Sequence, residues 1–350
     1  MSMSATYRSS PGNHAWDMTV RASLLSLALF GVASSSAAQR SGNTSPYHVV
    51  HEWPQLPVNA MLNEVSAVAV DSHEHVFVLT RGGRKWPDKD ALDTTAINDA
   101  TVLVFDGKTG RLMSTWPNRI LAMPHGITVD DQDDVWITDV AWHQVLKFSH
   151  DGKLLKTLGQ RGVAGEDTRH FNQPSDVAVS HDGTVYISDG YGNNRIVKFG
   201  ADGVFRKAWG TKGAAPGQLD LPHALAVSKD GKVYVVDRSN GRIQVFDSEG
   251  VHQALWKDSA LKSAQAVKVG RDGRVYVACA GNPGPDDRTG ILIFDVTGKV
   301  IGKVGRFGNY DGQFYDLHWV ALSASGALYT ADFEGRRVLK FTRGSAGRSY

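Results

Sequence analysis

Residues 124–148 read PHGITVDDQDDVWITDVAWHQVLKF, and this stretch decides the fold because the chain repeats its pattern. Three short segments within it alternate apolar residues with polar or small ones, which is the two-residue period of a β-strand. Residues 174–199 and 222–246 repeat the pattern, and Asp-Gly pairs mark tight turns between their strands. The stretch therefore predicts a sheet of short antiparallel strands that recurs along the chain.

Weaker copies of the same unit flank these three, which gives six units in all. Equivalent positions lie roughly 50 residues apart, the size of a propeller blade, and they are Ser66, His125, Ser175, His223, Gln265 and His318. We therefore expect an all-β protein, a six-bladed β-propeller over residues 45–343. The last unit has only three clear strands, so residues 47–53 are expected to supply its fourth strand and close the ring. A solenoid is the alternative, but polar capping repeats are lacking.

The N-terminus has the pattern of an export signal. Arg21 precedes an apolar run at residues 22–33, and small residues follow at 34–38. The run is too short for a membrane span, and Met18 is an alternative start. We expect a periplasmic or secreted protein, with an uncleaved or lipid-anchored tail as the alternative. The expected organisation is a signal peptide, a linker, the propeller and a C-terminal tail, over residues 1–38, 39–44, 45–343 and 344–350.

Charge and cysteine content narrow the function classes. Lys and Arg total 38 and Asp and Glu total 36, which predicts neither a nucleic-acid surface nor an anionic membrane patch. Cys279 is the only cysteine, so an intrachain disulfide is excluded. It occupies the repeat position that carries aspartate in other units, and we expect a small buried side chain and not a nucleophile.

Three histidines occupy the same position in alternate units: His125, His223 and His318. In a sixfold ring, alternate units point inward at about 120° to one another. Three neutral imidazoles with an open fourth position are a catalytic zinc arrangement. The intervening units carry serine or glutamine there, which bind zinc poorly. The alternative is that each histidine is a buried group, hydrogen-bonded within its own blade.

Two arginines and one tyrosine are expected at the same end of the ring. Arg81 and Arg238 each follow the repeat aspartate position, in two units that lie opposite each other, and paired guanidiniums would bind a carboxylate. Surface salt bridges are the alternative. Tyr191 lies between two glycines just beyond a repeat aspartate. Its phenol, with an unperturbed pKa of ~10, needs nearby positive charge to act as a base.

The repeat aspartates themselves are expected to be hydrogen-bond partners from blade to blade and not catalysts. They end the second strand of their units and are Asp139, Asp189, Asp237 and Asp332.

These residues resemble a known family. The repeats resemble NHL repeats, and the similarity to the peptidyl-α-hydroxyglycine α-amidating lyase domain runs from about Glu64 to Phe341. It is carried by Arg81-Gly82, Pro124-His125-Gly126, Ser188-Asp189-Gly190-Tyr191, Pro222-His223 and Asp237-Arg238. The resemblance implies a catalytic zinc on the residues matching His125, His223 and His318. It also implies that Tyr191 is the base, and that Arg81 and Arg238 serve the active site.

One departure from the family concerns calcium. The family has an aspartate directly after the third zinc histidine, and that carboxylate binds a structural calcium. Trp319 stands at this position, although Val68 and Ile127 match the two residues whose carbonyls are the other ligands. The calcium is therefore doubtful. Asp316 is the alternative source of a carboxylate.

The expected function is that of a zinc-dependent lyase. It would cleave an N-acyl or peptidyl α-hydroxyglycine, a carbinolamide, to an amide and glyoxylate. Its partner would be a small-molecule or peptide substrate with a carboxylate, without nucleic acid or a membrane span. One alternative is a non-catalytic NHL propeller that binds a ligand or protein. The other is a calcium-dependent propeller hydrolase or lactonase, although such sites need carboxylate and amide oxygens in place of imidazoles.

Overall fold

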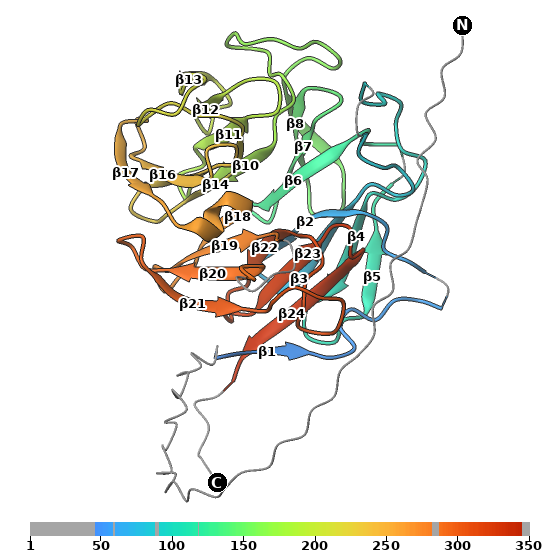
Figure 1. The fold of residues 1–350 in the computed structure, drawn as a ribbon. Coiled ribbons are helices and arrows are strands. Elements are labelled where there is room, and N and C mark those ends of the chain that lie inside the picture. Colours follow the sequence, from blue (N-terminus) through green and yellow to red (C-terminus); the bar gives the residue numbers. More distant parts are fainter. Residues whose placement is uncertain (1–45, 59, 88–90, 118, 282–286, 345–350) are drawn as a thin grey trace, which may run out of the picture. The chain divides into compact units, whose positions relative to one another are not determined.

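The computed structural model describes residues 46–58, 60–87, 91–117, 119–281 and 287–344. The expected signal peptide and linker, and all but the first residue of the expected tail, lie outside these ranges. The described chain folds into six four-stranded antiparallel sheets (Figure 1) and one short 3-10 helix, Ser259–Ser263. The prediction of a six-bladed β-propeller is confirmed. Among the described residues, no helix has the length and apolar character needed to cross a membrane.

The blades follow one another in chain order. Blades 1 to 5 are each built from four consecutive strands, and blade 6 combines the last three strands with β1. From the innermost strand outward, blade 1 consists of β2 (Val65–Val70), β3 (His75–Thr80), β4 (Val102–Asp106) and β5 (Leu112–Thr115), and blade 2 of β6 (Pro124–Val129), β7 (Val135–Asp139), β8 (Gln144–Phe148) and β9 (Leu154–Leu158). Blade 3 consists of β10 (Asp176–Val179), β11 (Val185–Asp189), β12 (Arg195–Phe199) and β13 (Phe205–Trp209), and blade 4 of β14 (Pro222–Val227), β15 (Val233–Asp237), β16 (Arg242–Phe246) and β17 (His252–Trp256). Blade 5 consists of β18 (Ala264–Val269), β19 (Val275–Cys279), β20 (Gly290–Phe294) and β21 (Val300–Val304), and blade 6 of β22 (Leu317–Leu322), β23 (Leu328–Asp332), β24 (Arg337–Arg343) and β1 (Tyr47–Val50).

Strand β1 closes the ring as the sequence predicted. It pairs antiparallel with β24, from Tyr47 opposite Arg343 to Val50 opposite Lys340, and completes blade 6 from the other end of the chain. This pairing satisfies one edge of β24 that would otherwise be open. Figure 1 shows β1 beside β24.

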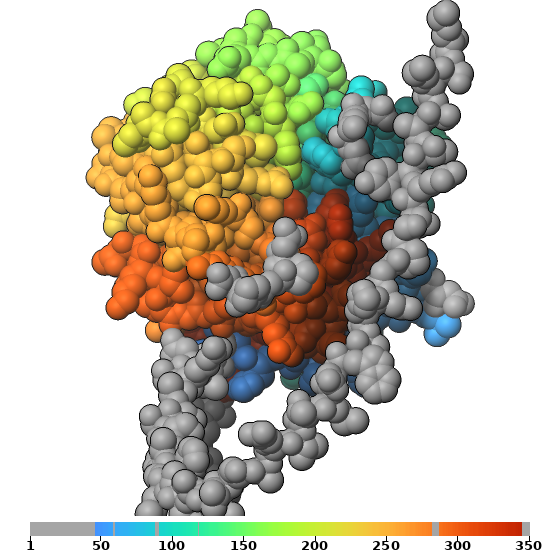
Figure 2. All heavy atoms as spheres, in the orientation of Figure 1, coloured from blue at the N-terminus to red at the C-terminus, as the bar shows by residue number. Residues whose placement is uncertain are grey.

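The innermost strands β2, β6, β10, β14, β18 and β22 form the inner wall of the ring. Each contacts the innermost strands of both neighbouring blades. They are almost wholly buried because blades cover them on both sides, which explains their high content of small and β-branched residues. In Figure 2 the blades follow one another in colour order, and red blade 6 lies next to orange blade 5.

The repeat aspartates act within a blade, so the expectation of blade-to-blade bonds is wrong. Asp139 ends β7 opposite Pro124, and its carboxylate accepts the backbone N–H groups of Ala122 and Met123. In an antiparallel pair, the second strand ends beside the start of the first. The carboxylate therefore reaches the loop that enters its own blade. Asp189, Asp237 and Asp332 likewise accept the N–H groups of Asn172, Asp220 and Tyr315.

Cys279 takes the equivalent place at the end of β19 and is fully buried. Burial raises the pKa of its thiol. The expectation of a small buried side chain is confirmed.

Candidate functional site

The three repeat histidines meet at the start of the inner wall. His125, His223 and His318 are each the second residue of an innermost strand, in blades 2, 4 and 6. Their imidazole centroids lie 4.8, 5.0 and 5.2 Å apart, and one nitrogen from each falls within 4.8 Å of the others. All three side chains are buried. The ring therefore brings them together, and they form a possible three-histidine metal site.

Backbone carbonyls of the intervening blades hold the three imidazoles in one tautomer. The Nδ1 atoms of His125, His223 and His318 lie 2.7, 2.6 and 2.6 Å from the carbonyl oxygens of Ser175, Gln265 and Ser66. A carbonyl only accepts, so each Nδ1 carries the hydrogen and each Nε2 keeps its lone pair. Metal-binding histidines typically make this outer hydrogen bond.

Ser66, Ser175 and Gln265 are thus the same repeat position in blades 1, 3 and 5, and they support the site through their backbone. From the sequence, their side chains were expected only to be poor zinc ligands. A carbonyl is present in every residue, so this role leaves no signature in the side-chain pattern.

Burial keeps the three imidazoles neutral. It lowers the pKa of His125 and His223 well below the usual value for histidine, and that of His318 to about 3. The mutual proximity of the rings contributes further for His125 and His223. Neutral imidazoles are the form that binds a metal.

Tyr191 reaches the same nitrogens from blade 3. Its phenol oxygen lies 2.9 Å from Nε2 of His125 and 2.9 Å from Nε2 of His223. A phenol carries one hydrogen and can donate to only one of these two acceptors. The buried lone pairs that converge here therefore exceed the donors, and a cation at their centre would satisfy them. The residues present fit a divalent metal on three imidazole nitrogens.

The charge around Tyr191 departs in one respect from the expectation. Arg238 and Arg81 both lower the pKa of the phenol, as predicted, and Arg238 does so partly through a side-chain hydrogen bond. Burial has the larger effect and raises the pKa overall. The two guanidiniums alone therefore do not produce a phenolate at neutral pH.

Arg81 is buried, and its guanidinium mainly contacts other residues of the same chain. It is 1% exposed, its Nε donates to the carbonyl of Pro124, and its Nη1 lies 3.6 Å from Glu64 Oε2. The guanidinium carbon lies 4.8 Å from the ring centroids of both Trp86 and Phe333. Burial lowers the pKa of Arg81 to about 10, which still leaves it protonated at neutral pH.

Arg238 is more accessible, because it lines an open pocket of about 680 Å³. Gln265, Asp316 and Glu334 line the same pocket. Burial raises the pKa of Asp316 to about 6, Glu334 adds to this effect and Arg238 opposes it. The two predicted arginines therefore differ: Arg81 is buried, whereas a solute can reach Arg238.

Gln265 connects this pocket to the histidines, a role that its repeat position did not predict. Its backbone carbonyl orients His223, and its side chain is 6% exposed on the pocket wall. Its Oε1 atom is buried and has no hydrogen-bond partner among the described residues. A buried acceptor without a hydrogen-bond partner costs free energy.

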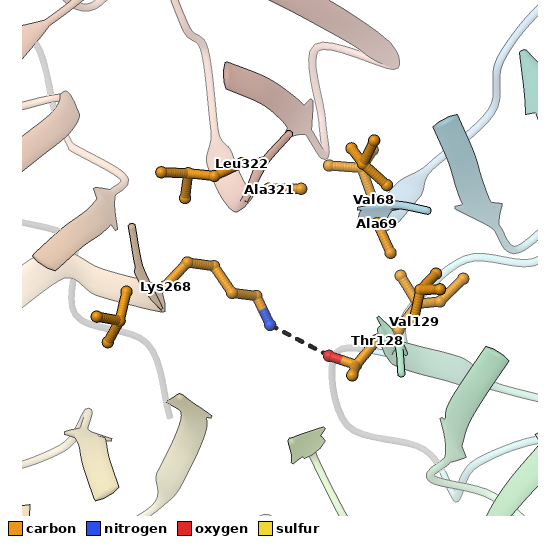
Figure 3. A pocket seen from close by; sticks show the side chains of 10 residues that line it. Val68, Ala69, Thr128, Val129, Lys268, Ala321 and Leu322 are labelled. Carbon is orange, nitrogen blue, oxygen red and sulfur yellow. Dashed lines mark hydrogen bonds between the residues drawn. The ribbon is translucent and has the colours of Figure 1, made fainter. Parts of the chain in front are cut away.

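A second, smaller pocket of about 140 Å³ lies between the innermost strands (Figure 3). Val68, Ile127 and Lys268 are among its lining residues. The Lys268 ammonium lies 3.4 Å from Thr128 Oγ1 and 5.5 Å from the ring centroid of Trp319. The Trp319 ring also contacts the His125 and His318 rings, at centroid distances of 5.9 and 5.7 Å.

The residues of this pocket do not fit a calcium ion. Val68 and Ile127, the expected carbonyl ligands, do line it, but its described lining contains no carboxylate. The fixed positive charge of Lys268 faces the space instead, and it would repel a dication. Asp316, the alternative carboxylate, lines the other pocket beside Arg238.

Comparison with known proteins agrees with this fold. The NHL repeat family matches residues 121–148, 171–199 and 219–246. The chain is 32% identical over 314 residues to peptidyl-glycine alpha-amidating monooxygenase B of Xenopus laevis, a match that covers 84% of this chain and 35% of that protein. The chain thus spans about a third of that relative's length.

A shorter relative matches over most of its length. The probable peptidyl-alpha-hydroxyglycine alpha-amidating lyase of Caenorhabditis elegans is 30% identical over 297 residues, which covers 80% of this chain and 82% of the relative. Among solved structures, a gluconolactonase from Xanthomonas campestris superposes with a TM-score of 0.56 at 15% identity, over 85% of this chain and 95% of that one. This likeness shows the fold alone.

Fold and site together define an NHL-repeat propeller with a three-histidine centre. The chain belongs to the peptidyl-α-hydroxyglycine α-amidating lyase family, as a lyase-like enzyme.

Proposed function

We propose that the protein is a zinc-dependent lyase that cleaves an N-acyl or peptidyl α-hydroxyglycine to an amide and glyoxylate. The observation that carries the proposal is the cluster of three imidazoles, each oriented by a backbone carbonyl, with the Tyr191 phenol 2.9 Å from Nε2 of both His125 and His223. Family membership supports lyase chemistry.

The ligand set favours zinc over calcium, because imidazoles suit zinc and calcium takes oxygen ligands. Zinc on these nitrogens would supply a Lewis acid that lowers the pKa of the substrate hydroxyl. The chain contributes the neutral tautomers and the buried surroundings, which strengthen electrostatic interactions.

Tyr191 is the proposed base. It accepts the proton of the substrate hydroxyl, and the electron pair of that oxygen forms the aldehyde C=O bond. The C–N bond breaks with its pair on the amide nitrogen, and the phenol returns the proton to that nitrogen. Protons and electrons then balance, and the products are the amide and glyoxylate. Burial raises the pKa of Tyr191, so the phenolate needs more positive charge than the two arginines provide.

Arg238 is the better placed of the two arginines to hold the substrate carboxylate. It lines the open pocket, whereas Arg81 is buried beside Glu64 and supplies charge to the site. A guanidinium–carboxylate pair would fix the orientation of the substrate.

Incubation of zinc-loaded protein with α-hydroxyhippurate tests the proposal. We expect glyoxylate release that His125→Ala abolishes and that His181→Ala, at a histidine whose side chain is 94% exposed, leaves unchanged. The proposal fails if wild-type protein releases no more glyoxylate than His125→Ala.

Two other functions give different outcomes. A binding module for a ligand or protein partner would bind zinc or α-hydroxyhippurate without turnover. A calcium-dependent hydrolase or lactonase would carry calcium and no zinc on elemental analysis. The three imidazoles and the Lys268 ammonium oppose this last reading.

We also propose that the chain is exported, on the basis of Arg21 and the apolar run at residues 22–33. N-terminal sequencing of protein secreted or recovered from a periplasmic fraction would then begin near Gln39. A start at Met1 or Met18 would contradict export with cleavage.

A further inference from the structure

A second group of metal-ligating side chains lies at the other end of the inner wall. Asp71 directly follows β2, His75 begins β3, and His150 lies in the turn after β8 of the neighbouring blade. One ligand atom from each falls within 4.8 Å of the others. Ser66, whose carbonyl orients His318, lies five residues before Asp71. At about 3.3 Å per residue, that separates the two groups by roughly 17 Å.

Asp71 is the anchor of this group. Its side chain is fully buried, and its Oδ1 accepts the backbone N–H groups of His73 and His75 at 2.9 and 2.7 Å. Its Oδ2 faces both imidazoles, 2.8 Å from Nδ1 of His75 and 2.9 Å from Nε2 of His150. The carboxylate is thus fixed by the backbone on one oxygen and presents the other to the histidines.

The two imidazoles are held in place but remain reachable. The His150 ring packs edge-on against Phe77 at a centroid distance of 5.1 Å and against His75 at 5.5 Å. The His75 ring stacks with His73 at 5.8 Å. The side chains of His75 and His150 are 25% and 44% exposed, so an ion can enter from solvent.

We propose that Asp71, His75 and His150 bind a divalent transition-metal ion, with zinc as the first candidate. Two imidazoles and one carboxylate, with a position left for water, are a ligand set that zinc uses. Metal–ligand bonds of about 2.0–2.1 Å place tetrahedral ligands about 3.3 Å apart. The Asp71 oxygen is 2.8 and 2.9 Å from the two nitrogens, and the two nitrogens lie within 4.8 Å of each other. The two oxygen–nitrogen separations therefore need to widen by about half an ångström.

Ion binding requires a change of tautomer. In the hydrogen-bonded arrangement, the imidazoles donate from the nitrogens that face Asp71. For metal binding, the hydrogen of His75 moves to Nε2 and that of His150 moves to Nδ1. The ion then joins the β2–β3 turn of blade 1 to the β8–β9 turn of blade 2. The alternative is that Asp71 and the two histidines connect these turns by hydrogen bonds alone, without a metal ion.

Zinc content separates the two accounts. Full-length His125→Ala protein, which lacks one ligand of the three-histidine site, is equilibrated with zinc and freed of unbound ion by gel filtration. We expect that adding His150→Ala to this background lowers bound zinc by one ion per chain. Adding His181→Ala should change nothing, although His181 also pairs with an aspartate of a neighbouring blade, Asp131. Circular dichroism checks that each variant is folded.

A zinc-dependent rise in melting temperature is the second readout. It should persist in His125→Ala and disappear when His150→Ala or His75→Ala is added, because the ion crosslinks two blades. Equal zinc content with and without His150 would overturn the proposal, and so would an equal loss in His181→Ala. The result does not depend on the proposed lyase activity, because every comparison is made without His125.

Discussion

Replacement of Tyr191 by phenylalanine removes one hydroxyl, with its contacts to the two Nε2 atoms and to Arg238, and leaves the contacts of the ring intact. The ring lies 5.0 Å from the Trp86 centroid and makes edge contacts with His125 and His223 at 5.1 and 5.6 Å. Phenylalanine preserves these contacts. It removes only the oxygen that lies 2.9 Å from the two Nε2 atoms, so the change in rate reports on the hydroxyl.

The expected loss follows from the role of the hydroxyl as the base. General acid–base groups contribute about 10²–10⁴-fold to a rate, which is about 2.7–5.5 kcal/mol of activation free energy. We expect kcat for α-hydroxyhippurate to fall by this factor. The KM should change little, because proton transfer acts in the transition state.

The assay measures glyoxylate release by zinc-loaded protein, with the zinc content of each variant determined in parallel. The control is Tyr310→Phe, at a tyrosine that is 80% exposed, and its kcat should match the wild type. A Tyr191→Phe variant with full zinc content and a kcat within about threefold of wild type would refute the assignment. A fall in kcat that only follows lost zinc would show a structural role instead.

Three other changes test separate parts of the account. Arg238→Gln should raise the KM for α-hydroxyhippurate by about 10–150-fold, the value of a hydrogen bond to a charged group, whereas Lys262→Gln on the same pocket wall should have a smaller effect; equal effects would contradict a specific carboxylate contact. Burial raises the folded-state pKa of Asp176 from 3.8 to about 6, and Lys268 opposes this effect. Ionisation of this carboxyl therefore lowers the free energy of unfolding of the wild type. The loss is absent below about pH 4 and complete above about pH 6. In urea unfolding, the stability of Asp176→Asn relative to wild type should therefore rise with pH across this window, by up to about 3 kcal/mol, and a pH-independent difference would contradict the expectation. Calcium should leave the melting temperature of the wild type unchanged and should raise it only when Lys268→Ala is combined with Trp319→Asp; a calcium-dependent rise in the wild type would show that the Lys268 ammonium does not exclude the ion.

The repeat pattern was sufficient to predict the fold and the meeting of the histidines. A unit that recurs six times sets the symmetry of the ring. Because of this symmetry, side chains at equivalent positions of alternate units point towards the same place on the ring axis. For this reason His125, His223 and His318 could be placed together although nearly 200 residues separate the first from the last. The closing strand β1 was predictable because the last unit lacked one strand.

The parts that could not be predicted depend on backbone groups or on detailed burial. The carbonyls of Ser66, Ser175 and Gln265 orient the imidazoles, and no side chain reports this role. Lys268 lies three residues past its repeat position, where side chains of four blades share one small space. Only the three-dimensional arrangement shows that its charge occupies the place expected for calcium.

The difference between the two arginines also required the structure. Arg81 and Arg238 occupy equivalent repeat positions, and the sequence treats them alike. The insertion after Arg81 carries Trp86, which covers that guanidinium together with Phe333. Arg238 has no such cover from its own loop and lines the open pocket.

An anomalous difference map at the zinc edge, from crystals of the zinc-loaded protein, tests the central claim most directly. The account predicts a peak about 2.0–2.1 Å from the Nε2 atoms of His125, His223 and His318 together. A map without density between these three nitrogens, or with an ion bonded to only one of them, would contradict it.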